Sequence, residues 1–361
     1  VHPQFQGGRL TALVYDLGGG TFDATTIVLE SNRIDTLATD GAVKLGGKDW
    51  DDRIVEYVAA AFKHAHNLEI PPERRHAIAN KAETAKKLLS QLPVTEIEHF
   101  DCDRQLRLTM TREQFEEMTR DLLAQTEVVT NLIVKQSRLR GSDRPLSWKD
   151  IDRVLLVGGS TRMPMVSQLL RRVTGKEPDR SLDPDQVVAR GAAVFANIIA
   201  ARGGEKLDLD DNVAAKLNEI GVVDVNSHSL GIEAYSLRMG KPLNAIVIPK
   251  NHPLPCAKSR VFPLKKQGMR EVWVRVLEGE APEPDANILL GQCVVSDLPA
   301  DLPAKSPVQV RLSCEPNGRV QVMAMDMTSG NYVHAEIKRN AGLTEDDIRR
   351  EAAFVNSLHI Q

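Results

Sequence analysis

Three consecutive glycines between two aspartates are the residues of this chain whose types and spacing first suggest chemistry. They lie in L-V-Y-D-L-G-G-G-T-F-D, residues 13–23, and are Gly18, Gly19 and Gly20. Without Cβ atoms, such a turn lets main-chain N–H groups approach an anion and point at it together, which favours phosphate. Thr21 adds a hydroxyl, and the Asp16 carboxylate can hold the water shell of a magnesium ion. A tight hairpin with a surface aspartate is the alternative, but the flanking Asp and Thr side chains favour a phosphate site. The run is neither G-x-x-x-x-G-K-[ST] nor G-x-G-x-x-G.

A second glycine turn follows a buried strand further along the chain. Residues 152–159, D-R-V-L-L-V-G-G, predict a parallel-type strand that ends at Gly158 and Gly159. Ser160 and Arg162 follow, and a proline then opens the helix that we expect next. The glycines permit close approach of a ligand, whereas a plain helix cap at Ser160 is the alternative reading.

These motifs resemble those of the seventy-kilodalton heat-shock chaperones (Hsp70, DnaK-type), members of the actin-like ATPase superfamily. The glycine run is similar to the family's second phosphate loop. L-G-G-K-D-W-D at 45–51, G-G-S-T-R-M-P-M at 158–165 and D-P-D at 183–185 follow in the family's order, although Lys48 replaces an acid. The resemblance begins near Leu10. It implies that the family's first lobe, with its own phosphate loop and catalytic lysine, is absent from this chain.

The resemblance also implies that a helix predicted at 72–91 binds adenosine. Glu83, Lys86, Lys87 and Ser90 have offsets of three, four and seven, which place them on one helical face. By this analogy the carboxylate meets ribose hydroxyls and the stems of the two cations sandwich the adenine. An ordinary solvated helix face is the alternative. The other ATP-binding residues implied by the resemblance are Gly158, Gly159, Ser160, Arg162 and Asp185.

The elements that would position these residues are those of an α/β domain. Strand-like alternation covers 10–40, and helices are expected at 72–91 and, as one long helix, from Thr111. The motif D-P-D predicts a helix capped by Asp183 and beginning at Pro184. The predicted fold class is α/β, as the second lobe of an actin-like ATPase domain, followed by an all-β sandwich and a C-terminal helix. We predict four segments: 1–201, the second half of an actin-like nucleotide-binding domain; 202–219, an interdomain linker; 220–342, a β-sandwich peptide-binding domain; and 343–361, the start of a helical lid.

The second half of the chain changes to short strands with frequent Pro and Gly, which is typical of a β-sandwich. Residues 222–234 resemble the opening of the family's peptide-binding domain. The peptide-binding residues that this implies are Ile232, Phe262 and Val272, lining an apolar pocket, with Tyr235 and Lys265 arching over it. Without the resemblance, the three apolar residues read as ordinary core.

Composition limits the possible function classes. The chain has 361 residues, 42% hydrophobic and 26% charged, which is enough for two domains with ordinary globular cores. A net charge of −3 argues against a nucleic-acid partner, because phosphate contacts need a basic face. The four cysteines form no C-x-x-C pair, so we expect reduced thiols in a cytoplasmic protein. We expect no membrane partner, because no long apolar run or signal peptide is found. Since residues 1–8 lack an initiator methionine, we expect a fragment.

The resemblance implies an ATP-dependent chaperone that binds extended apolar segments of unfolded proteins, with ATP, ADP and magnesium as ligands. ATP hydrolysis is expected of the complete protein, because this chain is expected to hold half of the active site. Partners implied by analogy are unfolded peptides, a J-domain co-chaperone and a nucleotide exchange factor. The alternative is a non-hydrolysing peptide-binding or scaffold protein with a degenerate nucleotide lobe. An actin-like or sugar-kinase-like enzyme is disfavoured by the predicted β-sandwich.

Overall fold

The structure, a computed structural model, describes residues 8–204, 209–236, 238–337 and 349–350. The chain divides into two units, Val1–Val223 and Asp224–Gln361, and each is described by itself. Together they form a mixed α/β, sheet-rich fold. The helix predicted near 343–358 lies outside the described residues, apart from Arg349 and Arg350.

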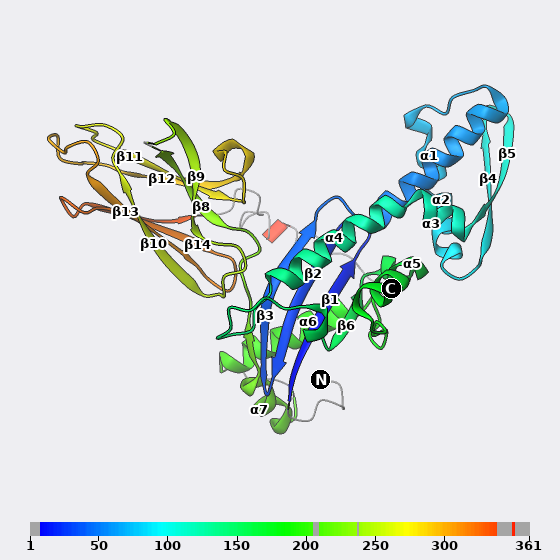
Figure 1. Ribbon diagram of the computed structural model, residues 1–361, viewed down its shortest axis with the longest axis horizontal. Coiled ribbons are helices and arrows are strands. Elements are labelled where there is room, and N and C mark those ends of the chain that lie inside the picture. The colour runs from blue at the N-terminus through cyan, green and yellow to red at the C-terminus, as the bar shows by residue number, and fades with distance from the viewer. Residues whose placement is uncertain (1–7, 205–208, 237, 338–348, 351–361) are drawn as a thin grey trace. The chain divides into compact units, whose positions relative to one another are not determined.

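The first unit is built on a five-stranded mixed sheet in the order β6-β1-β2-β3-β7 (Figure 1). Its strands are β1 (Arg9–Leu17), β2 (Phe22–Glu30), β3 (Arg33–Ala42), β6 (Arg153–Val157) and β7 (Gly221–Val223). β1 pairs antiparallel with β2 and parallel with β6, with Asp16 opposite Val157. Because the carboxyl ends of parallel strands meet at one edge, the two glycine turns predicted from the sequence leave the sheet side by side.

Helices and a hairpin extend this unit beyond the sheet. They are α1 (Gly47–His66), η1 (Pro72–Arg74), α2 (His76–Leu89), the hairpin of β4 (Val94–Asp101) and β5 (Arg104–Thr111), α3 (Arg112–Met118), α4 (Arg120–Gln136), η2 (Trp148–Asp150), η3 (Gly159–Arg162), α5 (Pro164–Thr174), α6 (Val187–Arg202) and α7 (Asp211–Glu219). α4 crosses one face of the sheet and packs on β2 and β3, while α1 and α2 pack together beside β4 and β5 (Figure 1). This arrangement confirms the α/β character predicted for this part of the chain.

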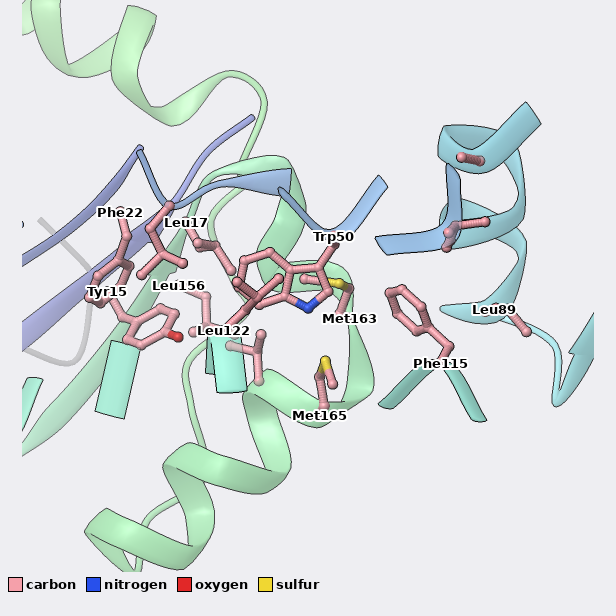
Figure 2. Packing of buried hydrophobic residues seen from close by; sticks show 14 of the residues in the cluster. Tyr15, Leu17, Phe22, Trp50, Leu89, Phe115, Leu122, Leu156, Met163 and Met165 are labelled. Atoms are coloured by element: carbon pink, nitrogen blue, oxygen red, sulfur yellow. The ribbon is translucent and has the colours of Figure 1, made fainter. Parts of the chain in front are cut away.

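One continuous hydrophobic core joins the sheet to these helices. Tyr15, Phe22 and Trp50 are its largest fully buried side chains, and Figure 2 shows Trp50 at the centre of the packed residues. The Tyr15 and Phe22 ring centroids lie 4.7 Å apart, and the Tyr15 hydroxyl donates to Thr126 Oγ1 at 2.6 Å. Each such ring contributes about 1.5–3 kcal/mol by its burial, so the ends of β1 and β2 that flank the glycine loop are firmly anchored.

The long helix predicted from Thr111 is instead two helices, α3 and α4, because the helical geometry is interrupted at Thr119. The Thr119 backbone has φ −115°, and its hydroxyl donates to the carbonyl of Phe115 at 2.8 Å. A local side-chain bond of this kind competes with continued helical geometry. The apolar periodicity of the sequence continues across Thr119, so periodicity alone did not predict the interruption of the helix.

The helix start predicted at Pro184 is wrong, because α6 begins at Val187. The Asp183 carboxylate accepts from the Asp185 N–H at 3.0 Å, and the Asp183 carbonyl accepts from the Val187 N–H at 2.9 Å. Asp183 therefore closes a turn before the helix rather than capping it.

Residues that we predicted as linker and second domain also belong to the first unit. Residues 202–219 include α7, whose Asp210 carboxylate caps it by accepting from the Asn212 N–H at 2.9 Å. Gly221–Val223, which we expected within the second domain, forms β7 and pairs in parallel with β3. A three-residue strand carries too little periodicity to be assigned from sequence.

The second unit contains two four-stranded antiparallel sheets, ordered β10-β13-β14-β15 and β12-β11-β8-β9. Their strands are β8 (Leu230–Ser236), β9 (Lys241–Ile248), β10 (Cys256–Pro263), β11 (Val272–Glu278), β12 (Ile288–Val295), β13 (Pro307–Cys314), β14 (Val320–Asp326) and β15 (Tyr332–Ile337), with η4 at Pro284–Ala286. Buried side chains of both sheets form one cluster. Cys256 and Cys314, distant in sequence, lie opposite each other in the β10–β13 register, and neither forms a disulfide among the described residues. Within the described part of the chain, no helix has the length and apolar character needed to cross a membrane.

Candidate functional site

Three backbone turns of the first unit meet at the glycine loop between β1 and β2. The Gly47 N–H donates to the Gly18 carbonyl at 2.9 Å, and the Lys48 N–H donates to the Gly19 carbonyl at 2.8 Å. The Ser160 hydroxyl donates to the same Gly18 carbonyl at 2.9 Å. Ser160 therefore does not cap a helix but ties the turn after β6 to the loop. These bonds occupy the loop carbonyls and orient the loop from behind.

The glycines at this junction serve two different purposes. A Cβ on Gly46 would lie 2.5 Å from the Gly20 nitrogen, and one on Gly158, whose φ is +84°, would lie 2.3 Å from the Leu17 carbonyl oxygen. These two positions need glycine for the close approach of backbones. In contrast, a Cβ on Gly19 or Gly20 would meet nothing within 4 Å. The front of the loop therefore faces open space that a ligand can fill.

A cavity of about 870 Å³ opens beside this loop. The predicted ATP-binding residues that line it are Gly19, Glu83, Lys86, Lys87, Ser90, Gly159, Ser160, Arg162 and Asp185. The remaining predicted residues, Asp16, Gly18, Gly20, Thr21 and Gly158, are not among its lining and belong to the adjoining loop and turn. The cavity thus brings together side chains from α2, the turn after β6 and the segment before α6.

Lys86 is the buried cation of this cavity. It is 8% exposed, and its ammonium donates to the Gly47 carbonyl at 2.7 Å and to Asp51 Oδ2 at 2.8 Å. Burial raises the pKa of Asp51, which the hydrogen bond from Lys86 opposes. A buried charge needs such partners. The ammonium is therefore held by Gly47 and Asp51 in a side chain that also lines the cavity.

Two exposed ion pairs stand at the rim of the cavity. Glu83 and Lys87 on α2 meet at 2.8 Å, and the hydrogen bond from Lys87 lowers the pKa of the Glu83 carboxyl. Arg162 meets Asp185 at 2.6 Å. Exposed pairs of this type are worth about 0–1 kcal/mol, so a ligand can displace either at little cost.

Sequence reasoning missed several residues of the cavity lining. They are Lys48, Asp51, Gln91, Leu156, Thr161, Arg180, Leu182 and Pro184. Lys48 and Asp51 lie in L-G-G-K-D-W-D, which was noted as a family motif without either residue being assigned to the site. Arg180 and Leu182 lie outside every motif, and only the fold brings them to the site.

The carboxylates beside the glycine loop fit a cation held through water better than a direct metal site. Burial, and then the neighbouring charge of Asp23, raise the pKa of Asp16. Burial also raises the pKa of Asp23, opposed by a hydrogen bond from Thr21. A cation would relieve this crowding of negative charge. No cluster of three or more His, Cys, Asp or Glu side chains arranged for a metal occurs among the described residues.

A second cavity, of about 350 Å³, lies in the second unit and is lined by all five residues predicted to bind peptide. Ile232 and Tyr235 come from β8, Phe262 from β10 and Val272 from β11, so both sheets contribute. The Lys265 ammonium lies 4.0 Å from the centroid of the Tyr235 ring. The cavity is thus apolar inside, with a cation on an aromatic ring at its lining.

Comparison with known proteins gives one consistent result. The family model described as Hsp70 protein matches residues 6–358. The chaperone protein DnaK of Thermotoga neapolitana is 34% identical over 353 residues, which cover 95% of this chain and 56% of that protein. DnaK of Thermosipho africanus is 35% identical, with 96% and 55% covered. The chloroplastic heat shock 70 kDa protein 6 of Arabidopsis thaliana is 34% identical over 346 residues, with 94% and 45% covered. The chain therefore spans about half the length of the curated relatives that it matches.

Proposed function

The chain belongs to the Hsp70 protein family, and on this premise we propose that it forms part of an ATP-dependent chaperone that binds extended apolar segments of unfolded proteins under nucleotide control. The observation that supports this most directly is the cavity of the first unit. It gathers nine of the predicted nucleotide-binding residues from four separated stretches of chain. An unrelated surface pocket would not be expected to be lined by these nine residues.

The proposed pose places adenosine against α2 and the turn after β6. The Glu83 carboxylate accepts hydrogen bonds from ribose hydroxyls, while the stems of Lys86 and Lys87 pack on the base. Arg162 lines the same cavity, and its guanidinium would stack on the other face of the base. Displacing the weak rim pairs makes these groups available to the ligand.

The phosphates would lie on the open front of the glycine loop, within reach of the N–H groups of Gly19 and Gly20 and the hydroxyl of Thr21. Bound magnesium would neutralise phosphate charge. Asp16 would orient its water shell; burial, and then the charge of Asp23, raise the pKa of that carboxyl, and a nearby cation would offset both effects. ATP hydrolysis is proposed for the complete protein.

The second unit is proposed as the peptide-binding domain, with its two sheets forming a β-sandwich and its cavity taking one aliphatic side chain. Burying such a side chain is worth about 1.5–3 kcal/mol. The proposed organisation is 1–201 as nucleotide lobe, 202–219 as linker, 220–342 as sandwich and 343–361 as the start of a lid, with the linker and Gly221–Val223 packed in the first unit, where β7 pairs with β3. A J-domain co-chaperone, a nucleotide exchange factor and a cytoplasmic location complete the proposal.

Calorimetry on the complete protein tests the nucleotide half. Glu83→Ala and Arg162→Ala should each weaken ADP and ATP to a similar degree, about tenfold, because the first removes a hydrogen bond to a charged group and the second removes a stacked guanidinium. Arg171→Ala, which removes an exposed arginine paired with Glu177 outside the cavity, is the matched control. If both cavity variants bind ADP with wild-type affinity, the assignment of Glu83 and Arg162 to the adenosine site is wrong.

Fluorescence anisotropy with a labelled leucine-rich peptide tests the peptide half. We expect micromolar or weaker binding that Val272→Asp abolishes, because a charge would then be buried in the pocket. Nucleotide dependence separates the proposal from a non-hydrolysing scaffold. In the complete protein, ATP should change the peptide off-rate, whereas a scaffold would release peptide at the same rate with and without ATP.

A further inference from the structure

Of the two charged side chains that line the peptide cavity, one has an oppositely charged partner and the other does not. Among the described lining residues, only Glu233 and Lys265 are charged. Glu233 is joined to Arg275 in an ion pair whose side chains are 27% and 34% exposed. Lys265 has no carboxylate partner among the described residues, and its ammonium instead lies on the face of Tyr235. A cation–π contact holds an ammonium in place without cancelling its charge.

The position of this contact is fixed from both sheets. Tyr235 is on β8, and its hydroxyl donates to the Gly240 carbonyl at 2.7 Å, which orients the ring. Lys265 lies two residues after the end of β10, which belongs to the other sheet. The contact therefore bridges the two sheets beside the apolar lining.

A second cation, Arg260, lies over another aromatic side chain of the lining, although Arg260 itself does not line the cavity. The Arg260 guanidinium lies 5.5 Å from the centroid of Phe262 and donates to the Ile246 carbonyl at 3.1 Å. Two of the aromatic side chains that line the cavity thus carry a cation on one face. An extended chain entering here meets apolar surface and the ammonium of Lys265, which pairs with no carboxylate among the described residues.

We propose that Tyr235 and Lys265 form a cationic latch that selects extended peptides carrying a carboxylate beside the buried aliphatic residue. This rests on the proposed function, namely that the cavity takes a peptide. In an extended chain, successive residues advance about 3.3 Å, so an Asp or Glu one or two residues from the buried side chain lies within reach of the Lys265 ammonium. A Lys or Arg in the same place meets like charge instead. The substrate class is therefore aliphatic segments with acidic flanks.

Three labelled peptides of equal length test this with the full 361-residue chain. They share one leucine-centred core flanked by Asp, Asn or Lys. We expect the Asp-flanked peptide to bind about five- to tenfold more tightly than the Asn-flanked one, and the Lys-flanked one to bind more weakly than either. The preference should shrink between low and 0.3 M salt, since exposed charges are screened.

Substitutions at Lys265 and Tyr235 distinguish the effect of the lysine charge from the effect of the tyrosine ring on peptide release. Lys265→Met should reduce the Asp-to-Lys affinity ratio to below about twofold, and Lys265→Glu should invert it. Lys266→Met removes the neighbouring exposed lysine, which does not line the cavity, and should leave the ratio intact. Tyr235→Leu should keep the sign of the preference while raising the off-rate of the Asp-flanked peptide about threefold or more.

The possible results distinguish the roles of Lys265 and Tyr235 from peptide binding itself. Equal binding of all three peptides overturns the latch while leaving the proposed function standing, provided Val272→Asp abolishes binding. Loss of the preference in Lys266→Met would assign it to diffuse surface charge and overturn the role of Lys265. An unchanged off-rate in Tyr235→Leu would refute closure by the ring. Absence of binding by every peptide overturns both the latch and the peptide-binding proposal.

Discussion

At the scale of single residues, Lys86 shows what helical spacing can and cannot reveal. Its offset from Glu83 and Ser90 predicts correctly that these side chains share one face of α2 and meet at one cavity. The spacing does not reveal that Lys86 is buried or that Asp51, 35 residues away, is its partner. That pairing depends on the packing of α1 against α2, which no local pattern encodes.

The buried pair should be worth far more to stability than its exposed neighbour. Asp51→Asn leaves the Lys86 ammonium without its counter-charge, and we expect the free energy of unfolding to fall by about 3 kcal/mol. Glu83→Gln breaks the exposed pair with Lys87 and should cost less than about 1 kcal/mol. Urea unfolding of both variants measures this difference. A cost for Asp51→Asn no larger than that of Glu83→Gln would show that the pair contributes no net stability.

Two glycines of the site should respond oppositely to alanine. Gly158→Ala forces a Cβ into a left-handed backbone and onto the Leu17 carbonyl, so a loss of about 2–4 kcal/mol is expected. Gly19→Ala meets no atom within 4 Å and should leave stability nearly unchanged. Its methyl would instead intrude on the phosphates and weaken ADP in the complete protein. Thermal unfolding and calorimetry on both variants check this, and equal ADP affinity in Gly19→Ala would contradict the proposed phosphate position.

At the scale of elements, periodicity predicted α2 and the strand β6 with small errors at their ends. It failed where a single polar side chain redirects the chain. Thr119 interrupts a continuous apolar face, Asp183 closes a turn ahead of α6, and Ser160 bonds across to another strand's loop. The sequence suggested a capping role for Ser160 and for Asp183, and in each case the side chain makes a different hydrogen bond.

The β4–β5 hairpin carries a histidine that should make the first unit sensitive to acid. His99 on β4 is 3% exposed, and neither ring nitrogen has a hydrogen-bond partner among the described residues. Burial, and then the charge of Lys81, lower its pKa below 6.5. The unfolded chain therefore takes up a proton first as the pH falls, so the stability is present above about 6.5 and is lost below it.

This predicts a pH dependence that one substitution should reduce. Between pH 7.5 and 5.5 the free energy of unfolding should fall by about 1 kcal/mol because of His99 alone. His99→Leu keeps an apolar side chain of similar size in the core and should lose that part of the change. Urea unfolding at the two pH values measures the difference between the proteins. Identical pH dependence in both would show that His99 titrates normally.

At the scale of the whole molecule, the order of motifs identified the family, and the described residues supply one set of phosphate donors at the glycine loop. Each charge-assisted hydrogen bond is worth about 1.5–3 kcal/mol, so two or three absent donors would weaken a site by about 3–9 kcal/mol. A micromolar site then becomes millimolar or weaker.

The 361-residue chain alone should accordingly show no chaperone-like ATPase activity. Phosphate release in the presence of magnesium should not exceed that of the Asp16→Asn variant measured in parallel. Magnesium-dependent turnover that Asp16→Asn abolishes would contradict this expectation and would mean that this chain holds a sufficient site by itself.

The most direct test of the central claim is to map ADP on this chain by amide NMR. Titration with ADP and magnesium to millimolar concentrations should shift the signals of Gly19, Glu83, Ser90, Gly159 and Arg162 together, with one dissociation constant. Adenosine should shift the residues of α2 and the turn after β6 but leave Gly19 in place. We therefore predict that ADP shifts the Gly19 signal and that adenosine does not. Shifts confined to other parts of the chain, or a Gly19 signal that follows adenosine as closely as ADP, would contradict it.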